Sequence, residues 1–139
     1  MAGRYGMEDH TADLGLWVEA DSLTELFASA VGALAEIMVL GGRQGQVQWL
    51  PLNLEGADLA ELLVALLNEV VYRLDAEGLV AVALEVSELT PVSLAGRLGV
   101  IPFDPARHQR GEPVKAVTYH EATVEPVGDG FRAHVVMDV

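Results

Sequence analysis

The stretch from Leu59 to Leu74 is the sequence feature that most constrains the fold, because only an α-helix gathers its apolar residues on one side. Its leucines and valines recur at spacings of three and four residues, which is the period of one helical face. Asp58 precedes the stretch and Glu61 follows Asp58 by three residues, a pattern typical of a helix N-terminus. The sequence therefore predicts a long amphipathic helix that ends near Asp75 to Gly78.

A second helix is predicted to begin after Ser22. Ser22 and Glu25 form the Ser-x-x-Glu pattern in which each side chain satisfies a backbone N–H of the first turn. Its apolar residues again follow the spacing of one helical face: Leu23, Leu26, Phe27, Ala30, Val31, Leu34, Ile37 and Met38. The Gly41-Gly42 pair is expected to stop this helix.

The other segments carry strand patterns. Residues 14–20 alternate apolar and other side chains, which is typical of a half-buried strand. Residues 45–54 contain Pro51, which favours an edge strand or a bulge. Residues 79–89 are almost continuously apolar, which predicts a strand buried on both faces or against the helices. Residues 92–100 alternate again after a turn at Thr90-Pro91, so these last two segments form a plausible hairpin.

The C-terminal part of the chain predicts a further hairpin. Residues 114–125 and 131–139 flank the turn signal Val127-Gly128-Asp129-Gly130, and residues 101–113 contain three prolines, which is typical of a surface loop. The expected order is βαβα followed by four strands. This order predicts the α+β class, with one domain over residues 1–139 and two helices packed on a mostly antiparallel β-sheet.

The composition of the chain argues against several kinds of function and site. The chain has 8 lysines and arginines against 21 acidic residues, a net charge of −13, and Lys115 is its single lysine. Such a surface repels a phosphate backbone, so we expect no strong direct binding of nucleic acid. The absence of cysteine excludes a disulfide framework and a thiolate metal site. No run approaches the ~20 apolar residues of a membrane helix, so we expect a cytoplasmic protein without a membrane segment.

Acidic residues at the two ends of the chain are candidates for a metal site. Asp13 precedes the first predicted strand and Asp138 ends the last one, so the two meet if those strands are antiparallel neighbours. Val139 is the final residue and adds a terminal carboxylate. Oxygen ligands of this kind suit a divalent cation such as calcium, magnesium or manganese. From spacing alone, ordinary solvated surface charges remain the alternative.

Several segments resemble the archease family. Residues 9–16, with the sequence Asp-His-Thr-Ala-Asp-Leu-Gly-Leu, resemble its N-terminal signature, and residues 115–120, Lys-Ala-Val-Thr-Tyr-His, resemble a second one. The Ser22 helix, residues 66–72 and the final residues 135–139 are also similar in order and spacing. The similarity extends over essentially the whole chain.

This resemblance implies a small sheet with two helices and a function as a protein cofactor without catalytic activity of its own. The implied partner is the tRNA-splicing RNA ligase, whose guanylylation and multiple turnover archease-like proteins promote in tRNA splicing and RNA repair. The family's metal ligands correspond to Asp13, Asp138 and the main-chain oxygen of Val139.

Three other signature residues have alternative interpretations. His10 lies in the second shell of the metal or caps a turn, and Lys115 contacts the ligase or is a solvated strand residue. His120 is a possible partner contact, because Tyr119, on the opposite side of the strand, is the one expected to pack against the core.

Two further functions remain open. A small divalent-metal-dependent hydrolase would use the ion to activate water between His10 and the carboxylates. A domain in which the metal has a purely structural role is the third possibility.

Overall fold

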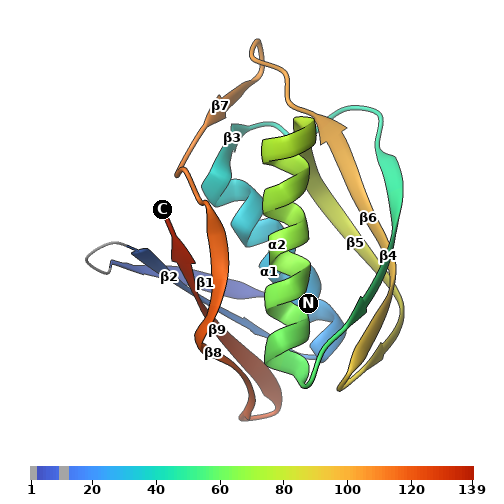
Figure 1. The fold of residues 1–139 in the computed structure, drawn as a ribbon, viewed down its shortest axis with the longest axis vertical. Coiled ribbons are helices and arrows are strands. Elements are labelled where there is room, and N and C mark those ends of the chain that lie inside the picture. Colours follow the sequence, from blue (N-terminus) through green and yellow to red (C-terminus); the bar gives the residue numbers. More distant parts are fainter. Residues whose placement is uncertain (1–2, 10–12) are drawn as a thin grey trace.

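Two helices lie between two antiparallel sheets (Figure 1) in the computed structural model, which describes residues 3–9 and 13–139. The helices are α1 (Leu23–Met38) and α2 (Leu59–Glu77). The four-stranded sheet has the order β1 (Arg4–Asp9), β2 (Asp13–Ala20), β9 (Gly130–Asp138), β8 (Ala116–Val127). The three-stranded sheet has the order β4 (Gln48–Glu55), β6 (Ser93–Pro102), β5 (Leu79–Thr90). Strands β3 (Val39–Gly41) and β7 (His108–Arg110) pair with each other in a separate two-stranded sheet.

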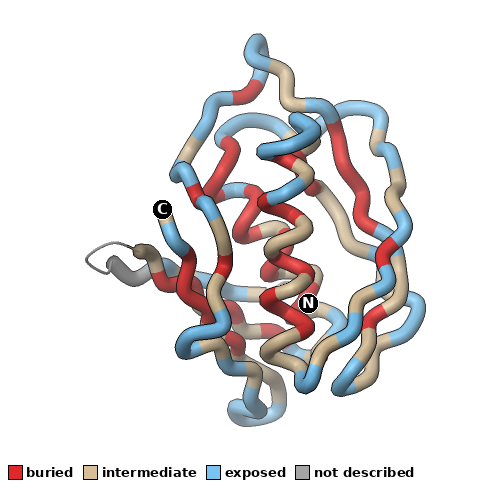
Figure 2. Tube along the Cα trace, in the orientation of Figure 1, coloured by how far each residue is buried: buried red, intermediate tan, exposed pale blue. Residues whose placement is uncertain are grey.

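The core lies where the helices meet the two larger sheets. Helix α1 packs on β2 and β5, and α2 packs on β8 and β5. Figure 2 shows the buried residues along both helices and on the strands that face them. Because α1 touches a layer on each side, Ala33 and Ala35 are buried in addition to the predicted stripe. The α+β class, with two helices on antiparallel sheet, is confirmed.

Three of the four predicted helix ends are confirmed. The Ser22 hydroxyl accepts from the Glu25 N–H at 3.1 Å, and the Asp58 carboxylate accepts from the Glu61 N–H at 2.8 Å. Gly78 ends α2 in the left-handed conformation, with φ of 66°. Such a φ is unfavourable for residues with a Cβ atom, so glycine suits this cap.

The end of α1 differs from the prediction. The helix stops at Met38 and the chain enters β3 directly, before the Gly41-Gly42 pair. The Arg43 guanidinium binds carbonyls at this helix end instead, donating to the Ala35 oxygen at 2.9 Å and to the Val39 oxygen at 2.6 Å. Partial burial lowers the pKa of this guanidinium, and the nearby Glu36 carboxylate opposes that shift.

The predicted strands are present. Strand β4 is an outer strand, as Pro51 indicated, and β5 and β6 form a hairpin. Of the two alternatives for residues 79–89, packing against the helices is confirmed, because both α1 and α2 pack on β5. Strand β5 is an outer strand, and only Val80 and Ala81 are fully buried in it.

Residues 101–113 are more ordered than a surface loop. Strand β6 extends to Pro102, and β7 pairs with β3 within this segment. His108 is only 5% exposed: its Nδ1 accepts from the Asp104 N–H at 2.9 Å, and its Nε2 lies 2.8 Å from the Gly42 oxygen. These partners fix the neutral Nε2–H tautomer and a structural role for this histidine.

Neither helix is both long and apolar enough to cross a membrane, within the part of the chain that the structure describes.

Candidate functional site

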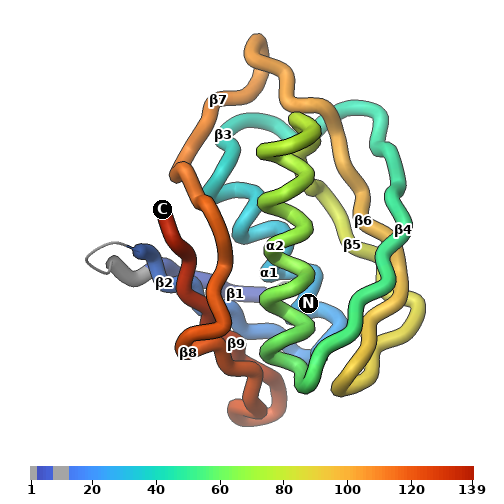
Figure 3. Tube along the Cα trace, in the orientation of Figure 1, coloured from blue at the N-terminus to red at the C-terminus, as the bar shows by residue number. Residues whose placement is uncertain are grey.

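Asp13 and Asp138 lie directly opposite each other on neighbouring antiparallel strands. The register pairs Asp13 with Asp138 and continues along β2 and β9 to Ala20 and Phe131. Figure 3 shows these two strands, from the blue and red ends of the chain, side by side. Side chains opposite each other in an antiparallel pair point to the same face, with Cβ atoms about 4.5–5.5 Å apart. We call Asp13 and Asp138 the terminal acidic pair.

This pair faces away from the helices. The buried partners Leu16–Val135 and Val18–Ala133 point to the core, so the alternate pairs point outward. Asp138 is exposed and Asp13 is half-buried. Two carboxylates at this separation repel each other unless a positive group reduces the repulsion.

Lys115 joins the same end of the sheet through its backbone. Its N–H donates to the Asp138 carbonyl at 2.8 Å, one residue before β8 begins, and Ala116 is the register partner of Asp138. The Lys115 side chain is exposed. The single lysine of the chain is therefore a residue whose backbone is hydrogen-bonded to one member of the terminal acidic pair.

The donor set fits a hydrated hard cation. Asp13 and Asp138 offer carboxylate oxygens, and Val139, which is half-buried against the core, follows Asp138 directly and offers main-chain oxygen. Among the described residues, no three histidine, aspartate or glutamate side chains gather closely enough to hold a metal. An ion here would depend on main-chain oxygen and water besides the two carboxylates, a pattern that suits Mg²⁺ better than Ca²⁺ with its 6–8 oxygen ligands.

His120 lies further along β8, on a bulge. The β8–β9 register is continuous to Thr118 and resumes at Thr123, and within the gap Glu121 has a φ of 60°. The His120 imidazole is 81% exposed and lies 3.5 Å from the Glu121 carboxylate. Tyr119 is also exposed, so the expectation that it packs against the core is wrong, because the bulge breaks the alternation of the strand.

His10 lies outside the described residues, in the connection between β1 and β2. Its proposed place in the second shell of a metal stays a prediction.

Asn68 is a residue of this region whose role the sequence pattern missed. Its side-chain amide donates to the Val117 oxygen at 2.9 Å, and its side-chain oxygen accepts from the Val117 N–H at 2.9 Å. Strand β8 has only β9 as a strand partner, so Asn68 pairs with its outer edge as a neighbouring strand would. The apolar period of α2 does not reveal this role, because the pairing joins residues 49 positions apart.

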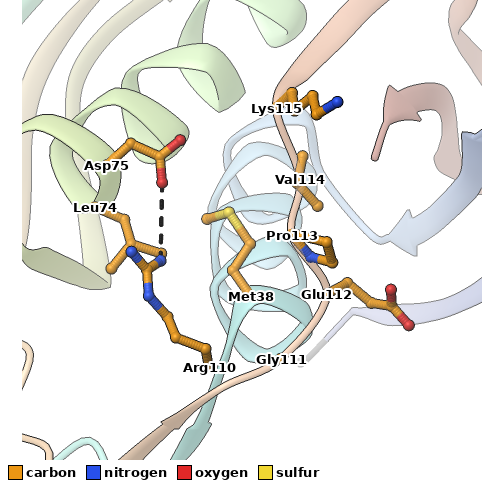
Figure 4. Close-up of a pocket in the computed structure, with 9 residues that line it drawn as sticks. All are labelled: Met38, Leu74, Asp75, Arg110, Gly111, Glu112, Pro113, Val114 and Lys115. Atoms are coloured by element: carbon orange, nitrogen blue, oxygen red, sulfur yellow. Dashed lines mark ion pairs between the residues drawn. The ribbon is translucent and has the colours of Figure 1, made fainter.

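A cavity of about 260 Å³ lies next to Lys115, between the C-terminal ends of the two helices and residues 110–115. Met38, Leu74 and Val114 give it apolar walls. In Figure 4, Arg110 points toward Asp75, with 3.7 Å between the guanidinium and the carboxylate, whereas Lys115 and Glu112 point away from this ion pair.

Comparison with known proteins gives consistent matches over nearly the whole chain. The sequence model of the Archease protein family (MTH1598/TM1083) matches residues 5–139. The chain is 35% identical to the protein archease of Pyrococcus furiosus, over 94% of this chain and 95% of that protein. It is also 35% identical to the protein archease of Archaeoglobus fulgidus, over 98% of this chain and 99% of that protein.

Two solved structures share the fold. The solution structure of Methanobacterium thermoautotrophicum protein 1598 superposes with a TM-score of 0.77 at 24% identity, covering 97% of this chain and 98% of that one. The crystal structure of an archease, possible chaperone, from Thermotoga maritima gives a TM-score of 0.60 at 20% identity, covering 95% of this chain and 94% of that one. At these identities the likeness shows the fold alone.

Proposed function

Because the chain belongs to the archease family, we propose that it is a non-catalytic accessory protein of a tRNA-splicing RNA ligase. In this function it acts in the cytoplasm, promotes guanylylation of the ligase and allows each ligase molecule to turn over many times. The observation that carries the proposal is the direct pairing of Asp13 with Asp138, next to Val139, at one end of the four-stranded sheet.

A divalent cation is part of this proposal. The carboxylates of Asp13 and Asp138 and the main-chain oxygen of Val139 would hold it, with water as further ligands. When bound, the ion supplies positive charge to a chain whose net charge is −13. The Asp13 and Asp138 carboxylates would then bind and orient this charge at the end of the sheet, where both strands and Lys115 hold their positions by backbone hydrogen bonds.

Lys115 and His120 are proposed to contact the ligase. Both side chains are exposed and both belong to the first part of the β8 region, in which Asn68 fixes the backbone of Val117. His10 is proposed as an outer partner of the metal ligands. Protein contact, not attraction to RNA, is expected to bring the acidic chain to its target.

A multiple-turnover ligation assay with the cognate ligase, GTP and Mn²⁺ tests the proposal. We expect the product formed per ligase molecule to rise when this protein is added. Asp13→Asn and Asp138→Asn should each abolish that rise, because ligand loss should weaken ion binding at least as much as the ~10–100-fold typical of second-shell changes. Asp129→Asn is the matched control, since Asp129 is exposed in the β8–β9 turn at the other end of the sheet.

The same preparations distinguish the alternatives. No change in ligase turnover at stoichiometric excess would contradict the accessory function. Hydrolysis of phosphate esters by the isolated protein, lost in Asp13→Asn, would support the metal-dependent hydrolase instead. Ion binding that raises thermal stability without any effect on the ligase would support the purely structural metal.

A further inference from the structure

An apolar groove lies between β1 and the C-terminal end of α1. Tyr5, Met7 and Leu40 line it with side chains that are 45%, 52% and 50% exposed, and Ile37 also lines it. Its volume is about 490 Å³, which falls within the ~300–1,000 Å³ range of ligand sites. Three large apolar side chains that share one groove and remain exposed indicate a binding surface more strongly than single exposed residues do.

The groove is bordered by a strand with an open edge. Strand β1 ends the order of the four-stranded sheet and pairs only with β2, in a continuous register from Arg4 to Asp9. Outer strands usually carry a feature that prevents pairing with another chain, such as a proline or a bulge. Strand β1 has neither within its described register.

The other three outer strands of the two larger sheets are each protected. Strand β4 contains Pro51, and β5 has register shifts at Ala81/Ala83 and Val86/Glu88. Strand β8 carries the bulge before Thr123, and the Asn68 amide occupies its edge at Val117. By these features, β1 is the outer strand of the two larger sheets that is most suited to accept a further strand.

The rim of the groove is acidic. Glu36 and Glu112 line it, and the Glu36 carboxylate accepts a hydrogen bond from Tyr5 at 2.8 Å. The one cation of the lining, Arg110, lies 3.7 Å from Asp75 and 5.5 Å from the Phe103 ring, and Figure 4 shows its guanidinium turned toward Asp75, which offsets its charge. The chain as a whole carries −13. An occupant should therefore combine apolar side chains with lysine or arginine.

We propose that β1 and this groove bind an extended, basic segment of a partner protein, which adds to the four-stranded sheet as a fifth strand. Alternate apolar side chains of the segment would enter the groove beside Tyr5 and Met7, and flanking cations would meet Glu36 and Glu112. That this partner is the RNA ligase rests on the proposed function.

Binding of the full-length ligase by isothermal titration calorimetry tests the surface. Met7→Glu and Leu40→Glu should each raise the dissociation constant about tenfold or more, because each places a carboxylate where the segment's apolar side chains bind. Val92→Glu is the matched control, since Val92 is 52% exposed in the β5–β6 turn. Asp13→Asn should bind the ligase but fail to activate it. If both groove variants bind the ligase with wild-type affinity and still activate it, the groove is not the binding surface. That result would leave the proposed accessory function unaffected.

A peptide titration followed by NMR keeps the inference testable without the ligase. The probe Lys-Ser-Val-Ser-Val-Ser-Lys places two valines and two lysines on one face of a strand, and Glu-Ser-Val-Ser-Val-Ser-Glu is its control. We expect the lysine peptide, and not the glutamate peptide, to change the NMR chemical shifts of Tyr5, Met7 and Leu40. These changes should be lost in Met7→Glu. Shifts elsewhere, equal shifts with both probes, or a wild-type dimer that Met7→Glu converts to monomers would overturn the proposal.

Discussion

The Asn68 side chain hydrogen-bonds helix α2 to the outer edge of the four-stranded sheet. Its two hydrogen bonds to Val117 satisfy a donor and an acceptor that β9 does not reach. Asn68→Ala should lower the free energy of unfolding by about 1–3 kcal/mol, the cost of leaving partly buried polar groups without partners. Urea denaturation measures this difference. Glu69→Ala is the control, because Glu69 is the next residue on the same helix and makes a half-buried ion pair with Arg73 at 3.4 Å, and equal losses in both variants would contradict the role of the amide.

The hydrogen bond between Tyr5 and Glu36 in the groove is predicted to make the stability of the folded protein depend on pH. The hydrogen bond to Glu36 is the largest cause that raises the pKa of Tyr5 above 10.0, followed by burial and by the charge of Glu36. The folded protein therefore holds the phenolic proton more tightly than the unfolded chain. This contribution to stability is complete below pH 10.0 and is lost as the pH rises through the raised pKa.

An NMR titration of the Tyr5 ring tests this coupling. Its midpoint should lie above 10.0 in the wild type and should fall in Glu36→Gln, because the amide keeps an acceptor but removes the negative charge. A midpoint that Glu36→Gln leaves unchanged would show that the carboxylate is not the cause.

At the scale of elements, α2 is predicted to be the main contributor to the core. Leu63 and Leu67 are 1% and 0% exposed, and their helix packs on β8 and β5. Either leucine changed to alanine should cost ~2–5 kcal/mol, the range for large-to-small substitutions in a core. Thermal or urea unfolding measures the loss. Tyr72→Ala on the exposed side of the same helix is the control, and leucine variants as stable as this control would refute the assignment.

The helices could be predicted from the sequence because their signals are local. The caps at Ser22 and Asp58 act over three residues, and the apolar period repeats within each helix. Strands β1, β3 and β7 were not predicted, because β3 and β7 have three residues each and β1 lacks a clear alternation. The division of the strands among three sheets depends on contacts between distant segments, which no local pattern encodes.

The candidate site shows the same division between local and distant information. The meeting of Asp13 and Asp138 could be anticipated, because a first and a last strand that are antiparallel neighbours bring those residues together. The Asn68–Val117 pairing joins residues 49 positions apart, and the His108–Gly42 contact joins residues 66 positions apart. Neither contact changes the apolar period, so the sequence pattern carried no sign of them.

At the scale of the whole molecule, the chain combines a net charge of −13 with a pairing of the Asp13 and Asp138 carboxylates where β2 begins and β9 ends. Self-repulsion of this kind destabilises a compact state, and screening by salt reduces it. A specific ion site should act differently from screening, because a ligand that binds only the folded state stabilises it in proportion to the logarithm of its concentration.

We therefore predict that Mg²⁺, Mn²⁺ or Ca²⁺ raises the melting temperature more than NaCl of equal ionic strength. At ~100 times the dissociation constant, the ion should add about 2.7 kcal/mol to the free energy of unfolding. Asp13→Asn and Asp138→Asn should each remove the additional gain, whereas Asp129→Asn should retain it. Because Asp138→Asn also removes one of two repelling charges, this variant should be at least as stable as the wild type without divalent ions. Calorimetric unfolding measures both effects, and an equal response to divalent ions and NaCl would argue against a metal bound by the terminal acidic pair.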